Sequence, residues 1–150
     1  MNPNFRDMLM ALFEENAEFL VVGAFAPSAH GLSRATGDLD IWVRRSTENA
    51  QSVWRALKRF GAPLRNLRVE DLQTKDIVYY MGTAPERIDV LTSISGIEFD
   101  EAWPQRTFFD LEGRAVPVLG KTDLIKNKRA SGRPKDLADL AWLESDQQSA

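Results

Sequence analysis

Hydrophobic residues at helical spacing open the chain. They recur every three or four positions at Phe5, Met8, Leu9, Leu12 and Phe13. This spacing predicts an amphipathic helix, with Asn4 as its N-cap. The apolar run Phe19–Val22 then predicts a short buried strand that ends at Gly23, and residues 27–32 predict one or two helical turns.

A two-residue alternation follows at Leu39–Val43, where apolar and polar positions take turns as in a strand with two different faces. Thr47–Phe60 returns to helical spacing, and Gly61 supplies the stop. Residues 77–81 and 87–91 predict two adjacent antiparallel strands, because Gly82 and Pro85 lie between them.

The last third of the chain predicts a hairpin and two helices. The hairpin spans residues 107–118 and turns at Glu112-Gly113, and the helices span 122–130 and 134–143 with Ser131-Gly132 between them. Residues 145–150 form a polar tail that we expect to fray. This order of elements predicts one α+β domain over residues 1–150, with helices packed on a mixed sheet.

Composition narrows the classes of function. The 150 residues are 43% hydrophobic and carry a formal charge of −3, which argues against a wholly basic protein that coats nucleic acid. The absence of cysteine excludes disulfides, thiolate nucleophiles and Cys-based metal sites, and the single histidine, His30, is assigned no role. We expect a cytoplasmic protein, because the sequence has no apolar run long enough for a membrane span and no export signal.

Three acidic residues carry the main chemical signal. Asp38 and Asp40 are two apart at a predicted strand, so their side chains should share one face, and Asp89 lies in another predicted strand. If the two strands are neighbours, three carboxylates converge on a place that suits a hard divalent cation such as Mg²⁺. The alternative is that all three line a solvated face of the sheet.

A second signal is the strand end at Gly23-Ala24 before a predicted short helix. A glycine there permits close backbone approach, and the free N–H groups of a helix favour phosphate. An ordinary strand-to-helix turn has the same pattern. A third signal is the basic segment 121–136, which carries a net +4 while the rest of the chain carries −7.

In combination these residues resemble the polymerase-beta-like nucleotidyltransferase superfamily. Its pattern is a strand that ends in Gly-Gly or Gly-Ser, a strand with an acid-apolar-acid arrangement, and a third acid on a later strand. The matching positions are Gly23-Ala24, Asp38-Leu39-Asp40 and Asp89. Further segments of this chain resemble the small bacterial branch related to abortive-infection toxins and minimal nucleotidyltransferases. They are Arg34–Asp40, Asp123–Ile125, Asn127–Arg129, Gly132–Asp136 and Asp139-Leu140.

The resemblance implies an enzyme that moves a nucleoside monophosphate from an NTP to a hydroxyl acceptor such as RNA, protein or a small molecule. Asp38 and Asp40 would hold two Mg²⁺ ions, with Mn²⁺ as a substitute, and Asp89 would complete the shell of one of them. The implied nucleotide-binding residues are Gly23, Ala24, Arg34, Thr36, Lys128, Arg133 and Lys135. The resemblance also implies that Asp136 orients one of the basic side chains by ion pairing.

Two classes of function stay open at this point. The first is the enzyme, with a role in a toxin–antitoxin pair included. The second is a catalytically weak module of the same fold that binds a nucleotide, nucleic acid or protein through the basic C-terminal helices. The three acids Asp38, Asp40 and Asp89 favour the first class. The small size of the chain and Ala24 favour the second, because a hydroxyl that would contact phosphate is missing at Ala24. A partner protein or self-association would help so small a domain to close a pocket.

Overall fold

The computed structural model describes residues 1–23, Ala26, 37–83 and 85–149, with side chains up to residue 145. Within these ranges the chain forms one six-stranded sheet with strand order β3-β4-β2-β1-β6-β5. The strands are β1 (Phe19–Val22), β2 (Leu39–Val43), β3 (Val78–Met81), β4 (Ile88–Leu91), β5 (Thr107–Leu111) and β6 (Arg114–Val118). The helical turns predicted at 27–32 lie outside the described residues.

The sheet is mixed, as the sequence predicts. β2 runs parallel to β4 and β1 runs parallel to β6, whereas the pairs β1–β2, β3–β4 and β5–β6 are antiparallel. The predicted pairing of residues 77–81 with 87–91 and the predicted hairpin over 107–118 are therefore both confirmed. The parallel pairs place β1 and β2 at the centre of the sheet, where all but one of their nine residues are buried.

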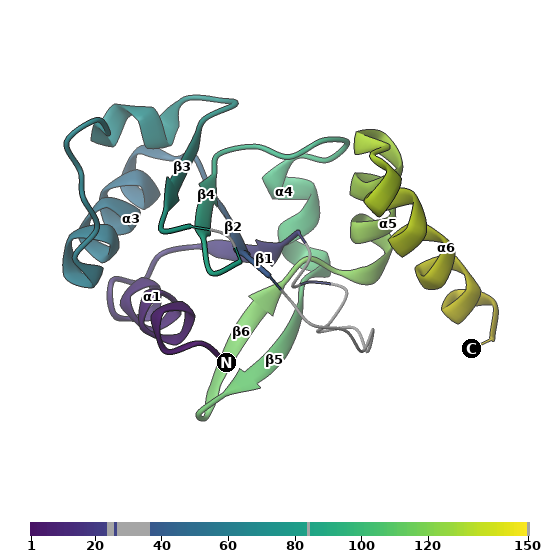
Figure 1. The fold of residues 1–150 in the computed structure, drawn as a ribbon. Coiled ribbons are helices and arrows are strands. Elements are labelled where there is room, and N and C mark those ends of the chain that lie inside the picture. The colour runs from purple at the N-terminus through teal and green to yellow at the C-terminus, as the bar shows by residue number, and fades with distance from the viewer. Residues whose placement is uncertain (24–25, 27–36, 84, 150) are drawn as a thin grey trace.

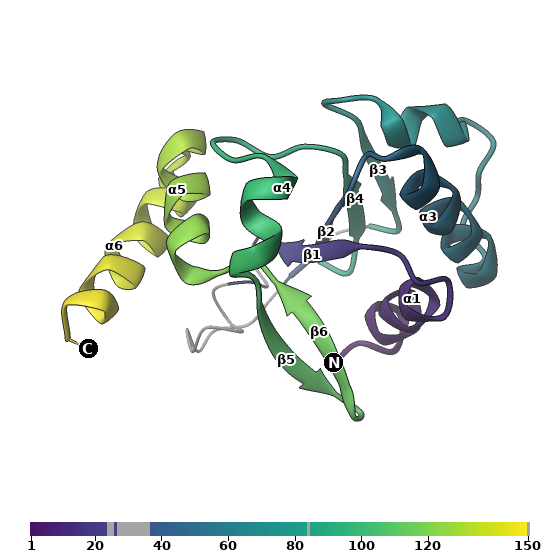
Figure 2. The ribbon, with the colours of Figure 1, turned by 180° about the vertical axis from the view of Figure 1, so that it is seen from behind.

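The long helices form two separate pairs (Figures 1 and 2). α1 (Pro3–Glu14) and α3 (Thr47–Phe60) pack against each other, and α5 (Lys121–Ser131) and α6 (Pro134–Ser149) form a second pair at the opposite end of the molecule. α4 (Phe99–Ala102) lies between the two pairs in both views. In the described part of the chain, no helix is both long and apolar enough to cross a membrane.

The ends of the helices follow ordinary capping chemistry, with one correction to the sequence prediction. The N-cap of α1 is Asn2 rather than Asn4: its side chain accepts a hydrogen bond from the Asn4 amide at 2.7 Å, and Pro3 takes the first helical position, which suits proline. Gly61 ends α3 in the left-handed conformation at φ 91°, as predicted. α6 continues to Ser149, beyond the predicted end at residue 143.

Three short elements are absent from the sequence prediction. They are the 3₁₀ turns η1 (Val69–Gln73) and η2 (Trp103–Gln105) and the single-turn helix α4. Each is too short to show a helical period. Trp103 contacts Phe99 in a stacked arrangement with ring centroids 5.4 Å apart, and Phe99 packs edge-on against Trp42. Tertiary packing rather than local pattern therefore holds this segment.

Candidate active site

The register of the sheet places two acidic residues side by side. Asp40 on β2 pairs with Val22 on β1 and with Asp89 on β4, and Asp89 in turn pairs with Tyr80 on β3. Four neighbouring strands therefore contribute one row of residues across the sheet. The prediction that β2 and β4 are neighbours, so that their carboxylates converge, is confirmed for Asp40 and Asp89.

Asp38 immediately precedes the first residue of β2. Its Oδ1 accepts a hydrogen bond from the backbone N–H of Arg87 at 2.8 Å, and the Leu39 amide donates to the Arg87 carbonyl at 2.9 Å. Asp38 therefore fixes the start of β4 against the start of β2. Its carboxylate stays on the same end of the sheet as those of Asp40 and Asp89.

Asp40 and Asp89 repel each other in a confined place. Asp89 is only 8% exposed, and the two side chains share a hydrogen bond. Burial, followed by the charge of Asp89 and this hydrogen bond, raises the pKa of Asp40 to about 7, and the positive charge of Lys135 opposes the rise only in part. The pair lacks enough positive charge to keep both carboxylates ionised at neutral pH.

Gly23 makes room for Asp40. Its φ is +69°, and a Cβ atom built at this position would lie 1.9 Å from Oδ2 of Asp40. No side chain larger than hydrogen fits there without moving the carboxylate. The sequence predicts a glycine for close approach, and the group that approaches in this structure is the Asp40 carboxylate.

Arg87 is a site residue that sequence reasoning missed. Its guanidinium donates from Nε to Oδ1 of Asp89 at 2.7 Å and from Nη2 to Oδ2 at 3.1 Å, and Nη2 lies 3.8 Å from Oδ2 of Asp38. The signal that would have found it is the alternation Arg87-Ile88-Asp89, since residues two apart at a strand share a face.

The carboxylate pair opens into a hollow of about 370 Å³. Gly23, Asp40 and Asp89 form one wall, and Asn127 and Arg133 of the α5–α6 end form the other. Arg133 keeps 65% of its side chain exposed, and its pKa is raised first by its hydrogen bond to Asp136, with a contribution from the negative charge of Asp40. Negative and positive walls thus face each other across a space of ligand size.

The three predicted cations have different positions. Arg133 lines the hollow, and exposed Lys135 is close enough to act on Asp40 through its charge. Lys128, in contrast, is only 1% exposed, and its Nζ lies 3.4 Å from Asp136 and 3.2 Å from Asp139. The structure does not bring Lys128 to the hollow, because buried carboxylates already bind its ammonium group.

Asp136 connects the buried lysine to the hollow. Its carboxylate accepts hydrogen bonds from Nε of Arg133 at 2.6 Å and from the Ser131 hydroxyl at 2.8 Å. Burial alone would raise the pKa of Asp136, but these hydrogen bonds and the charge of Lys128 outweigh it and lower the pKa to about 2. The prediction that Asp136 orients a basic side chain by ion pairing is confirmed for Arg133.

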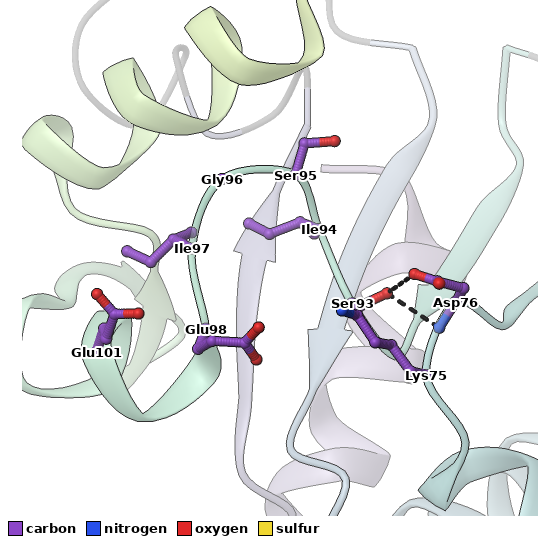
Figure 3. A pocket seen from close by; sticks show the side chains of 9 residues that line it. All are labelled: Lys75, Asp76, Ser93, Ile94, Ser95, Gly96, Ile97, Glu98 and Glu101. Carbon is purple, nitrogen blue, oxygen red and sulfur yellow. Dashed lines mark hydrogen bonds between the residues drawn. The ribbon is translucent and has the colours of Figure 1, made fainter.

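A larger hollow of about 560 Å³ lies on the other side of the loop 93–97 (Figure 3). Ser93, Ile94 and Ser95 belong to both hollows, so the loop is a shared wall. The wall is firmly held: Ser93 donates to Asp76 at 2.7 Å, and Asn127 donates to the carbonyl of Ser95 at 2.9 Å.

The donor set suits a divalent cation, although the present arrangement does not surround one. In the described residues, no three side chains of the Asp, Glu, His or Cys type are placed to hold one metal ion together. The guanidinium of Arg87 binds both oxygens of Asp89 and lies beside Asp38. The three carboxylates offer hard oxygen ligands, and the raised pKa of Asp40 reflects a shortage of positive charge that a cation would correct.

Ala24, Arg34 and Thr36 complete the predicted nucleotide-binding set, and all three lie outside the described residues. Their roles stay predictions. His30, to which we assign no role, also lies outside the described residues.

Comparison with known proteins supports the fold. No protein-family model matches the chain, and no curated protein matches it significantly. Among solved structures, the chain is similar to the "putative nucleotidyltransferase (TM1012) from Thermotoga maritima" with a TM-score of 0.57 and 17% identity, over 94% of this chain and 91% of that one. The chain has a nucleotidyltransferase-like α+β fold.

Proposed function

We propose that this protein is a Mg²⁺-dependent nucleotidyltransferase that moves a nucleoside monophosphate from an NTP to a hydroxyl acceptor. The observation that carries the proposal is the pairing of Asp40 with Asp89 on neighbouring strands, next to Gly23 and across a hollow from Arg133. The nucleotidyltransferase-like fold supports it. The binding-module alternative accounts less well for two acids pressed together without enough positive charge.

The proposal gives each described residue a part. Asp38, Asp40 and Asp89 would hold Mg²⁺, which when bound neutralises phosphate charge and increases the acidity of a nearby hydroxyl. Arg133, which is hydrogen-bonded to Asp136 and lines the same hollow as the carboxylates, would attract the triphosphate, and the positive charge of Lys135 would assist it. Gly23 keeps space open beside Asp40.

The reaction needs positioning more than covalent chemistry by the protein. The acceptor oxygen forms a bond to the α-phosphorus, the bond from that phosphorus to the bridging oxygen breaks, pyrophosphate leaves, and the hydroxyl proton passes to solvent. The larger hollow beyond the shared loop offers room for the acceptor, since its wall of Ser93 to Ser95 also borders the carboxylate hollow. RNA, a protein or a small molecule can supply the hydroxyl, and we include a role in a toxin–antitoxin pair in the proposal.

The test is label transfer. The protein is incubated with each α-³²P-labelled NTP, Mg²⁺, and total cellular RNA, total protein or a metabolite extract, and labelled products are separated. We expect transfer by the wild type and by Asp110→Asn, a control on the exposed part of β5, and none by Asp40→Asn. Absence of transfer by the wild type to all three acceptor pools would contradict the proposal.

A further inference from the structure

The guanidinium of Arg87 occupies the space between two carboxylates of the site. It binds Asp89 through two hydrogen bonds, at 2.7 and 3.1 Å, and its Nη2 lies 3.8 Å from Asp38. A bidentate arrangement of this kind uses both oxygens of Asp89. The same oxygens are those that a metal ion would need.

Arg87 is held from the outer side by an aromatic ring. The guanidinium carbon lies 5.3 Å from the centre of the Tyr80 ring, and Tyr80 pairs with Asp89 across β3 and β4. The register of β3 and β4 therefore places Tyr80 next to Asp89, and both contact Arg87. The arginine side chain nevertheless remains 38% exposed, so solvent can receive it if it leaves.

We infer that Arg87 is a built-in counter-ion of the carboxylate site, which a divalent cation must displace, so that Arg87 sets how tightly the site binds metal. The inference rests on the proposed function, since it concerns the metal of that same site. One positive charge on Arg87 offsets part of the repulsion among three carboxylates when no metal is bound. A divalent ion offsets more of it and forms closer contacts with the oxygens.

The inference has a consequence in each state of the site. Without metal, Arg87 keeps Asp38 and Asp89 in place and prevents them from moving apart. With metal, the arginine loses its two hydrogen bonds to Asp89, and this loss lowers the net affinity for the ion. Removal of the guanidinium should therefore strengthen metal binding, whereas removal of a residue that helps to hold the metal would weaken it.

The test is titration with Mn²⁺ in the absence of nucleotide, followed by calorimetry and by loss of the free-ion electron paramagnetic resonance signal. We compare the full-length wild type with Arg87→Met, Arg87→Lys and the control Arg65→Met, which removes an exposed arginine outside the site. We expect about tenfold tighter binding for Arg87→Met. Arg87→Lys should lie between, because lysine keeps the charge but loses the bidentate contact. Arg65→Met should match the wild type.

A second measurement guards against a variant that is simply less stable. Without metal, Arg87→Met should melt at a lower temperature than the wild type, since the carboxylates lose their counter-ion. Saturating Mn²⁺ should then raise its melting temperature by more than it raises that of the wild type. Equal or smaller stabilisation would overturn the inference.

The outcomes separate this inference from the proposed function. If the wild type binds Mn²⁺ and Arg87→Met binds it equally or more weakly, Arg87 does not compete with the ion, and the proposed function is untouched. If no variant binds Mn²⁺, both fail. If only Arg87→Met binds, the competition is stronger than we expect and the inference is supported.

Discussion

Two clusters of charged side chains lie near the same hollow, one behind Arg133 at the α5–α6 end and one on the sheet, and their charges are balanced differently. On the α5–α6 side, Lys128 and Arg133 face Asp136 and Asp139, so that two cations meet two carboxylates. On the sheet side, a single guanidinium, that of Arg87, contacts Asp38 and Asp89, and Asp40 lies beside Asp89 without a contact of its own to Arg87. The first cluster is complete in itself, and the second has an excess of negative charge.

The pKa values of the two clusters move in opposite directions for this reason. The pKa of Asp136 falls to about 2 because hydrogen bonds and cations surround it, whereas that of Asp40 rises to about 7 because burial and Asp89 are not offset. Burial of charge alone therefore does not identify a site. An imbalance of buried charge marks a candidate site, because folding has left in place a repulsion that an additional cation would relieve.

Breaking the balanced cluster should have the largest effect on stability. Lys128→Met removes the ammonium group that contacts Asp136 and Asp139, while both carboxylates stay buried. We therefore expect a loss of about 3–5 kcal/mol in the free energy of unfolding. Lys126→Met, on the same helix but half exposed, is the control and should change stability by less than about 0.5 kcal/mol. Urea denaturation measures both. A Lys128→Met protein as stable as the control would show that the cluster contributes little.

Breaking the unbalanced cluster should affect catalysis instead. Under the proposed function, Asp89→Asn should reduce transfer on the order of 10²-fold or more while Mg²⁺-NTP binding largely remains, since this carboxylate would support the acceptor side of the reaction. The label-transfer assay gives the rate, and equilibrium binding of a labelled NTP gives the affinity. Full activity in Asp89→Asn would remove Asp89 from the mechanism.

Acid should weaken the balanced cluster selectively. The pKa of Asp136 is lowered in the folded protein, so its stabilising contribution is present above about pH 4 and is lost as the pH falls toward 2. We expect the difference in unfolding free energy between the wild type and Asp136→Asn to shrink by about 2 kcal/mol between pH 6 and pH 2.5. A difference that stays constant over this range would contradict the lowered pKa.

The smallest expected effect is a gain in stability. The pKa of Asp40 is raised in the folded protein, so its ionised form destabilises the metal-free fold, and this penalty grows as the pH rises from about 4 through 7. Asp40→Asn in EDTA should therefore melt about 2–5 °C higher than the wild type at pH 8, and the difference should be smaller at pH 5. A lower melting temperature at pH 8 would show that Asp40 stabilises the fold.

The sequence was informative where spacing alone decides the outcome. The two-residue alternation located β2, and the turn residues Gly82 and Pro85 located β3 and β4. The neighbouring carboxylates Asp40 and Asp89 followed from the assumption that β2 and β4 touch. The contact of Arg87 with Asp89 follows from the same spacing and was overlooked, whereas its approach to Asp38 depends on which strand lies beside it. The position of Lys128 was predicted wrongly. Its place in a basic helical segment suggested an exposed cation, but the side chain is buried and contacts two aspartates of α6.

The row of Val22, Asp40, Asp89 and Tyr80 across four strands makes the acid pair a product of sheet assembly. A slip of β4 by one residue would place Ile88 or Val90 opposite Asp40 and turn Asp89 to the other face. During synthesis, a growing chain that has completed β2 lacks this acid pair, and it gains the pair only when β4 has also been made and has docked in register.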